Sequence, residues 1–272
     1  MMEKQRKKRL FALVRINLKA LAAVALSAVL CAAAVITVSA VTAEEGVVIP
    51  VVMYHSVLKD EARHGKYVIS PKEFENDLNY LKQHGYTTIL TEDLIAYTQG
   101  GELPEKPVLL TFDDGYYNNY LYAYPLAKQY GCKFVIAPIG FYADQYSTTP
   151  DENAYYSHAT WDELKEMADS GLVEVQNHSY NLHKSDGGRL GVKRVSGETE
   201  QQYETMLTGD LLQAQEEIER HVGVRPTTFV YPFGALSKGT PDIVKKLGFS
   251  VTLSCEEKIS SVTRDPGSLY YL

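Results

Sequence analysis

The stretch Val108-Leu109-Leu110-Thr111-Phe112-Asp113-Asp114-Gly115 joins a short apolar run to two adjacent carboxylates and a glycine. The run from Val108 to Phe112 predicts a buried strand, and Asp113-Asp114-Gly115 marks its carboxyl end. Two neighbouring carboxylates are costly to place, because like charges repel and burial disfavours both charged forms. A metal ion would neutralise one carboxylate and leave the other free as a base. A solvated Asp-Gly turn is the simpler alternative for these residues taken alone.

Apolar runs alternate with amphipathic stretches on both sides of this strand. The other predicted strands are Val47–Tyr54, Thr87–Leu90, Lys133–Pro138, Leu172–Gln176, Thr227–Tyr231 and Phe249–Leu253. The predicted helices are one that Ser70-Pro71 opens and Gly85 closes, followed by Thr91–Thr98, Tyr116–Tyr130, Thr160–Ser170, Glu198–His221 and Pro241–Leu247. This alternation predicts an α/β fold with a mostly parallel sheet. About seven strand–helix units favour a barrel or near-barrel, with functional loops at the carboxyl ends of the strands.

Three further motifs follow predicted strand ends. They are Asn177-His178-Ser179-Tyr180-Asn181-Leu182-His183, Tyr231-Pro232-Phe233-Gly234 and Met53-Tyr54-His55-Ser56. Each has an ordinary explanation on its own: two surface histidines, a simple turn, and a structural histidine. Because all four motifs fall at strand ends, which meet at one edge of a parallel sheet, the sequence predicts that they form one site.

Asp114, His178 and His183 together make a ligand set of two histidines and one carboxylate. Mixed nitrogen and oxygen ligands with open positions suit a divalent metal ion: zinc, cobalt, nickel, manganese or ferrous iron. The turn Tyr231-Pro232-Phe233 can direct a backbone N–H into the site while its ring walls a groove. A ferrous oxygenase, which uses the same ligand set, is one alternative, although those enzymes are usually all-β.

The amino-terminal segment has a different character from the rest of the chain. Residues 1–43 carry seven Lys and Arg against one Glu, a charge of +6, and the run from Ala20 to Ala43 is uncharged. As a helix this run would be about 36 Å long, enough to cross a bilayer. The sequence predicts a basic cytoplasmic segment over 1–19 and, over 20–43, a membrane anchor or a signal peptide cleaved near Ala43. Residues 44–272 would then lie outside the cell membrane.

Composition excludes several classes of protein. Residues 44–272 carry 20 Lys and Arg against 33 Asp and Glu, a charge of −13, which leaves no basic surface for nucleic acid. The cysteines, Cys31, Cys132 and Cys255, are too few for a disulfide scaffold and lack zinc-finger spacing. A chain with 45% hydrophobic and 22% charged residues is neither disordered nor a multi-span membrane protein.

From about residue 47 onward, the chain resembles a polysaccharide deacetylase, the NodB-homology or carbohydrate esterase family 4 domain. The resemblance rests on Thr111-Phe112-Asp113-Asp114-Gly115, then His178-Ser179 with His183, then Pro232-Phe233-Gly234, in that order. The early Met53-Tyr54-His55 and the spacing of the two histidines are most similar to the branch that acts on poly-N-acetylglucosamine. The resemblance implies a distorted (β/α) barrel and a divalent metal, often zinc. It also implies an N-acetylated polysaccharide as substrate.

The resemblance also implies roles for individual residues. Asp113 would be the catalytic base. Three residues would bind the metal: Asp114, His178 and His183. A backbone N–H near Phe233 would help to hold the oxyanion.

The chain departs from the family pattern at two places. An Arg that orients the base in many members is Val230 here, and no His follows His221 to supply the family's late general acid. In the similar branch the His of the Met-Tyr-His motif is thought to take that role, which implies His55 as the acid. Within this interpretation, peptidoglycan deacetylation and O-acetyl ester hydrolysis stay open. Val230 also supports a different alternative, a glycan-binding module without catalysis.

Overall fold

The structure is a computed structural model, and it describes residues 46–272. The predicted basic segment 1–19, the predicted apolar segment 20–43 and the cleavage position near Ala43 lie outside these residues. Within 46–272, no helix combines the length and the apolar character that crossing a membrane requires.

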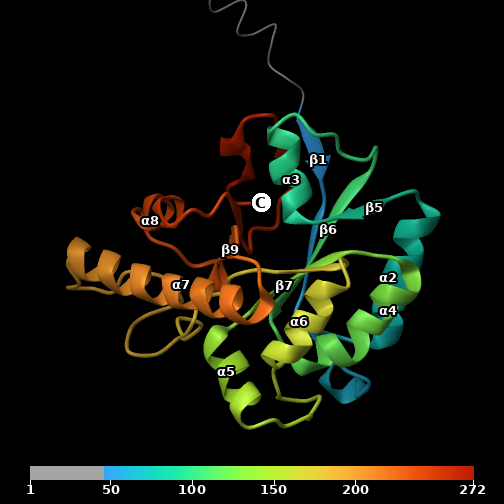
Figure 1. Cartoon of the computed structure of the whole chain (residues 1–272), viewed down its shortest axis with the longest axis horizontal. Coiled ribbons are helices and arrows are strands. Elements are labelled where there is room, and N and C mark those ends of the chain that lie inside the picture. Colours follow the sequence, from blue (N-terminus) through green and yellow to red (C-terminus); the bar gives the residue numbers. More distant parts are fainter. Residues whose placement is uncertain (1–45) are drawn as a thin grey trace, which may run out of the picture. The chain divides into compact units, whose positions relative to one another are not determined.

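Strands and helices alternate along most of the described chain, as the sequence predicts (Figure 1). The strands are β1 (Val47–Ile49), β2 (Val51–Tyr54), β3 (Ser56–Val57), β4 (Val68–Ile69), β5 (Thr87–Ile89), β6 (Pro107–Asp114), β7 (Phe134–Pro138), β8 (Val173–Val175), β9 (Thr228–Val230), β10 (Val251–Leu253) and β11 (Ser260–Val262). The α-helices are α2 (Pro71–Gln83), α3 (Thr91–Thr98), α4 (Tyr124–Tyr130), α5 (Gly140–Thr148), α6 (Trp161–Asp169), α7 (Glu200–Val222) and α8 (Thr240–Lys246). Short 3₁₀ helices are η1 (Glu61–Arg63), η3 (Pro232–Gly234) and η4 (Pro266–Leu269), and η2 (Asn119–Ala123) is a π-helix.

A parallel sheet stands at the centre of the fold. β6 pairs in parallel with β2, β5 and β7, and β7 pairs in parallel with β8. β9 and β10 form another parallel pair, which a parallel bridge between Asn177 and Phe229 links to the end of β8. The predicted α/β fold with a mostly parallel sheet is therefore confirmed. The strand pairs of the described chain fall into four sheets and do not form one hydrogen-bonded ring.

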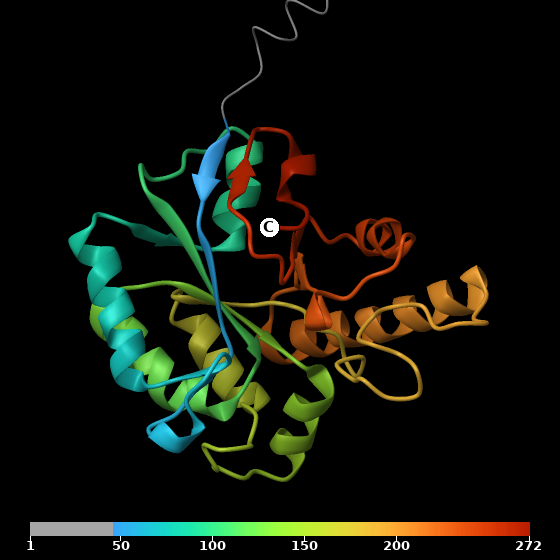
Figure 2. The ribbon, with the colours of Figure 1, turned by 180° about the vertical axis from the view of Figure 1, so that it is seen from behind.

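β6 is buried on both faces, and its side chains alternate between two apolar clusters. Leu110 and Phe112 pack in one cluster with Phe74 of α2, and Leu109 packs in the other with Leu94 of α3. In both views α2 and α4 lie side by side, while α3 lies beside the carboxyl-terminal segment (Figures 1 and 2). The strand that carries the two carboxylates is thus held from both sides, which fixes the position of its carboxyl end.

Three helices begin with the hydrogen-bonded cap that their sequences predict or permit. The side-chain hydroxyls of Ser70, Thr160 and Thr199 each accept a hydrogen bond from the backbone N–H three residues on, and the side chain at that position accepts one from the backbone N–H of the cap residue. Such a cap is worth about 0.5–2 kcal/mol. The predicted cap at Thr91 is wrong, because α3 begins with Leu90 at that position and Thr91 lies inside the helix.

The structure differs from the predicted elements at several places, and the short strands β3, β4 and β11 were not predicted. The strand predicted over Val47–Tyr54 is divided at Pro50, which cannot donate to a ladder: β1 pairs with β11 and β2 pairs with β6. Within the helix predicted over Tyr116–Tyr130, residues Asn119–Ala123 form a π-helix, and α4 follows from Tyr124. α5, Gly140–Thr148, was not predicted, since its apolar residues follow no clear helical period.

Candidate active site

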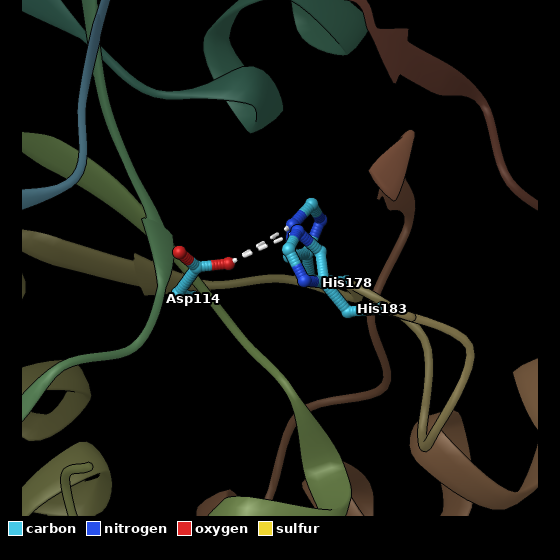
Figure 3. Close-up of side chains that lie close together, drawn as sticks. All are labelled: Asp114, His178 and His183. Carbon is cyan, nitrogen blue, oxygen red and sulfur yellow. Dashed lines mark ion pairs between the residues drawn. The ribbon is translucent and has the colours of Figure 1, made fainter. Parts of the chain in front are cut away.

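The carboxyl ends of neighbouring parallel strands bring three polar side chains together. Asp114 is the last residue of β6, and His178 and His183 lie on the loop that follows β8 (Figure 3). The Nε2 atoms of His178 and His183 lie 3.5 and 3.3 Å from the same oxygen, Asp114 Oδ1. All three ligand atoms lie within 4.8 Å of one another. The convergence that the strand-end positions predict is therefore present.

The backbone around Asp114 is shaped to present its side chain. Asp114 has φ 67°, which is uncommon for a residue other than glycine, and Gly115 follows with φ 70°. A Cβ atom at position 115 would lie 2.7 Å from Pro138, so glycine is required for spatial reasons as well. The Asp114 carbonyl lies 3.0 Å from Nδ1 of His158, a buried side chain between the rings of Tyr116 and Tyr142.

Hydrogen bonds from distant elements hold the loop that carries the two histidines. His178 Nδ1 lies 2.9 Å from the Val230 carbonyl, so this nitrogen donates and Nε2 is left to face Asp114. Asp210 of α7 accepts hydrogen bonds of 2.8 Å from the backbone N–H groups of both Tyr180 and Asn181. These contacts turn the chain back so that His183 returns to the site. Val230 thus contributes its backbone carbonyl, and its apolar side chain packs in the core.

The three residues fit a divalent metal ion on two independent observations. Ligand atoms about 2.0–2.2 Å from a tetrahedrally coordinated ion are separated by about 3.4 Å, and the two distances to Asp114 Oδ1 are 3.3 and 3.5 Å. Asp114 Oδ1 is also buried without a hydrogen-bond partner, which is costly unless a cation or another donor satisfies it. The backbone hydrogen bond of His178 is the type of outer contact that orients a metal-binding imidazole.

Electrostatics places two of these groups in the forms that coordinate a cation. Although burial opposes ionisation of Asp114, the neighbouring imidazoles of His178 and His183 hold its pKa well below the usual range. Burial and the neighbouring His178 lower the pKa of His183 to about 4, so its imidazole is neutral at pH 7. An ionised carboxylate and a neutral imidazole are the metal-binding forms. Burial disfavours the charged form of His178, but the neighbouring carboxylates of Asp114 and Asp113 raise its pKa above the usual value.

The surroundings of Asp113 differ from those of Asp114. The Asp113 side chain is 2% exposed, and among the described residues Oδ1 has no hydrogen-bond partner. Burial raises the pKa of Asp113, and the negative charge of Asp114 adds to this effect. A buried carboxylate of raised pKa beside a cation site has the properties of a general base.

His55 lies in the same cleft as the carboxylates and the two other histidines. It follows β2 directly, and β2 pairs with β6, which places His55 beside the carboxyl end of the strand that carries Asp113. Its ring packs edge-on against the ring of Tyr67, with 4.9 Å between the centroids. The prediction that the fourth motif joins the others at one site is therefore consistent with the structure.

The cleft has a volume of about 490 Å³ and an aromatic margin. Tyr67, Tyr155 and Phe233 line it and are each about half exposed. Exposed aromatic rings in an open cleft suit the faces of sugar rings. Cys255, which follows β10, also lines the cleft and is a free thiol, as is the buried Cys132.

The turn after β9 differs in part from its predicted role. Tyr231 is fully buried in an apolar cluster with Phe229, and Pro232 is buried too, so neither side chain lines the groove. The sequence motif could not reveal this, because the core that covers Tyr231 comes from distant helices. Phe233 does line the cleft: it has φ 58° and is 44% exposed, and its ring lies 4.2 Å from that of His183.

Comparison with known proteins agrees with this architecture. Residues 100–252 match the family model described as Polysaccharide deacetylase. The chain belongs to the polysaccharide deacetylase family. The resemblance found in the sequence motifs is thus confirmed, and the ferrous oxygenase alternative, which rested on the ligand set alone, loses its support.

Relatives of this deacetylase domain include the poly-beta-1,6-N-acetyl-D-glucosamine N-deacetylases of Escherichia coli strain K12 and Staphylococcus aureus strain N315. The first is 27% identical over 236 residues, which are 78% of this chain and 34% of the relative. The second is 27% identical over 206 residues, which are 75% of this chain and 66% of the relative. The chain therefore spans about a third of the length of the Escherichia coli protein.

Two solved structures resemble the deacetylase domain in fold. A de-N-acetylase from Aggregatibacter actinomycetemcomitans superimposes with a TM-score of 0.70 at 29% identity, covering 83% of this chain and 93% of the other. IcaB from Ammonifex degensii superimposes with a TM-score of 0.67 at 27% identity, covering 84% and 90% of the two chains.

Several residues that hold the site in place were not identified from the sequence. His158 and Asp210 hold backbone groups of the segments that carry the candidate metal ligands, and Asn119 holds the segment of His55. Each lies many residues from the group it contacts, and no local pattern distinguishes it from a surface residue. A polar residue on the apolar face of an amphipathic helix, as with the half-buried Asp210 in α7, is the one signal that the sequence offers.

Proposed function

We propose that this protein is a metal-dependent deacetylase that removes N-acetyl groups from an amino-sugar polysaccharide and releases acetate. The observation that carries the proposal is the convergence of His178 and His183 on Asp114 Oδ1, with the buried Asp113 beside it. This arrangement combines a cation site with a base of raised pKa, which hydrolysis of an unreactive amide requires. The names of the relatives support poly-β-1,6-linked N-acetylglucosamine as the first substrate to test.

In the proposed reaction, residues of this chain transfer protons and stabilise the charge that develops. The Asp113 carboxylate takes a proton from a water as the water oxygen attacks the acetyl carbonyl carbon. A backbone N–H near Phe233 helps to hold the oxyanion that forms, as the family resemblance implies; one well-placed donor contributes about 3–4 kcal/mol. His55 donates a proton to the sugar nitrogen as the carbon–nitrogen bond breaks. The products are acetate and a free amine on the sugar.

Asp114, His178 and His183 are proposed to hold the divalent ion. When bound, the ion supplies Lewis-acid chemistry, which polarises the carbonyl oxygen and makes a water more acidic. One carboxylate and two imidazoles with open positions suit zinc, with cobalt, nickel and manganese as alternatives.

Acetate release from a panel of acetylated glycans, with and without a chelator, tests the proposal. We expect chelator-sensitive release from N-acetylglucosamine polymers, restored when zinc is added back. Release only from peptidoglycan, or only from O-acetylated glycans, would redirect the proposal to those substrates. Binding of a glycan without any acetate release would instead support the non-catalytic module that Val230 suggested.

We predict that His55→Ala lowers turnover on an N-acetylated glycan by about 10²-fold or more, which is the usual range for general acid catalysis. The loss is expected to be smaller on an activated acetate ester, because its leaving group departs without a proton. Steady-state kinetics on both substrates, with elemental analysis of the metal, checks this result.

His84→Ala is the matched control for His55. His84 lies at the end of α2, outside the cleft, and its ring contacts Tyr80. Equal losses on amide and ester in His55→Ala, together with a lowered melting temperature, would show that His55 has only a structural role.

The predictions for the rest of the chain remain proposals. We propose that the deacetylase domain lies outside the cell membrane, either anchored by the segment 20–43 or secreted after cleavage near Ala43. The basic cluster before the uncharged run supports this orientation. Protease added to intact cells should degrade the domain if it is anchored outside. The distorted (β/α) barrel of the family likewise remains a proposal for the arrangement of all its strands.

A further inference from the structure

We propose that Asn119 is a positioning residue that holds His55 against the carboxylate end of the site. The inference rests on the proposed function, because it assigns Asn119 to the alignment of the proton donor in that reaction. Asn119 Nδ2 donates a hydrogen bond of 2.7 Å to the backbone carbonyl of His55, 64 residues away along the chain. Asn119 itself follows the Asp113-Asp114-Gly115 segment by only a few residues, so one short stretch of chain connects base and acid.

A neighbouring asparagine extends this connection to the next two residues of the same loop. Asn118 Oδ1 accepts a hydrogen bond of 2.9 Å from the backbone N–H of Val57, and Asn118 Nδ2 donates one of 2.8 Å to Ser56 Oγ. Asn119 Nδ2 also lies 3.2 Å from Asn118 Oδ1. The two amides therefore contact three consecutive residues, 55 to 57, and together they restrain this segment at the start of β3.

The local backbone explains how the adjacent side chains of Asn118 and Asn119 can both face residues 55–57. Asn119 begins the π-helix η2, which ends at Ala123 and leads directly into α4. A π turn contains an extra residue relative to an α turn and changes the direction in which side chains point; such turns are frequent at functional sites. Here the π-helix lies a few residues after β6, and the amide of Asn119 reaches the residue between β2 and β3.

The amide of Asn119 is buried and only partly hydrogen-bonded, so it does not contribute to stability alone. Its side chain is 0% exposed, and its Oδ1 is buried without a hydrogen-bond partner among the described residues. An unpaired buried carbonyl oxygen costs free energy that an apolar side chain of similar size would not incur. The compensating contacts are the hydrogen bonds of Asn119 Nδ2 to the His55 carbonyl and to Asn118 Oδ1.

Strand pairing holds the residues on either side of His55, in β2 and β3, and Asn119 supplies the side-chain hydrogen bond to the His55 carbonyl itself. The His55 ring meets Tyr67, which is 53% exposed and lies before the short strand β4, and the ring faces the open cleft. An error of 1 Å in the position of a catalytic group can lower the rate by about 10²-fold. A fixed backbone at residue 55 is therefore expected to increase the rate of the reaction. Loss of the Asn119 bond would let this segment move while the metal-binding residues, on β6 and the loop after β8, stay in place.

A double-mutant cycle between Asn119 and His55 tests the inference. The quantity measured is the ratio of kcat/KM on an N-acetylglucosamine oligomer to kcat/KM on an activated acetate ester. This ratio is independent of the fraction of enzyme that is folded, because an unfolded fraction lowers both values equally. We expect Asn119→Ala to lower the ratio about 10- to 100-fold, with unchanged metal content. In the His55→Ala background, Asn119→Ala is expected to leave the ratio unchanged.

Two further variants make the outcome decisive. Asn119→Ser, which keeps a polar group at the buried position but lacks the amide, should lower the ratio in the same direction even if Asn119→Ala does not accumulate. Asn79→Ala is the matched control, since Asn79 Nδ2 donates to Tyr130 Oη at 3.0 Å between two helices outside the cleft; it should not change the ratio.

If the ratio is unchanged in both Asn119 variants while the wild-type chain is active, the inference is wrong but the proposed function stands. An equal change in the presence and absence of the His55 imidazole would overturn the inference too, because Asn119 would then act on another part of the site. Absence of acetate release from every glycan by the wild-type chain would overturn the proposed function and this inference with it.

Discussion

Replacement of Asp114, His178 or His183 by Ala is expected to abolish metal binding and to lower acetate release to below about one-thousandth, more than the loss of one oxyanion donor costs. The reason is that both imidazole nitrogens converge on a single carboxylate oxygen, at 3.5 and 3.3 Å. Removal of any one group leaves at most two protein ligands for the ion. Elemental analysis after gel filtration and an acetate assay check both parts of the prediction.

The fold should survive these three replacements, although not with identical stability. His178 is 1% exposed and its replacement by Ala leaves a cavity, whereas the side chain of His183 is 20% exposed and its loss should cost less. Circular dichroism would establish that the secondary structure is retained. His84→Ala is the control, because it makes the same substitution at the end of α2, outside the cleft. Full metal stoichiometry in any one variant would remove that residue from the ligand set.

Asp113→Asn is expected to keep the metal and to lose activity by about 10²–10⁴-fold, the usual contribution of a positioned base. The amide has the size of the carboxylate, but it cannot take a proton from water. Asp113 Oδ1 faces no hydrogen-bond donor among the described residues, and burial raises the pKa of its carboxyl, so folding disfavours its charged form. Removing this charge should therefore leave the melting temperature at pH 7 unchanged or raise it.

The metal content, the acetate assay and the melting temperature of Asp113→Asn together separate the two adjacent carboxylates. Asp77→Asn is a suitable control, because Asp77 accepts a hydrogen bond of 2.9 Å from Tyr54 Oη and does not line the cleft. If Asp113→Asn lost its metal as completely as Asp114→Ala does, Asp113 would be a ligand and the assignment of the base would be wrong.

Asp113 and Asp114 show that neighbouring residues of one type can acquire opposite properties. The neighbouring imidazoles of His178 and His183 lower the pKa of Asp114 in spite of its burial, whereas burial dominates at Asp113 and raises its pKa. The sequence Asp-Asp-Gly contains no sign of this difference. It arises because side chains alternate along a strand, so two successive carboxylates face different surroundings.

Much of the fold followed from the sequence because its signals are local. Capping residues before α2 and α6, glycine after α4 and apolar runs at β6 and β7 each act within a few residues, and each predicted element is present. The candidate site followed as well, because parallel strands place their carboxyl ends at one edge. A motif at each strand end was therefore enough to predict that His55, Asp114 and His178 meet.

Tertiary structure alone decided which residues face the cleft and what holds them. Tyr231 and Phe233 belong to one turn, yet the first is buried under distant helices and the second lines the cleft. Asn119 and Asp210 contact backbone groups 64 and about 30 residues away in the chain. Local sequence determines secondary structure through nearby backbone preferences. Burial and hydrogen-bond partners, in contrast, depend on which remote segments pack together, and no short pattern of residues records them.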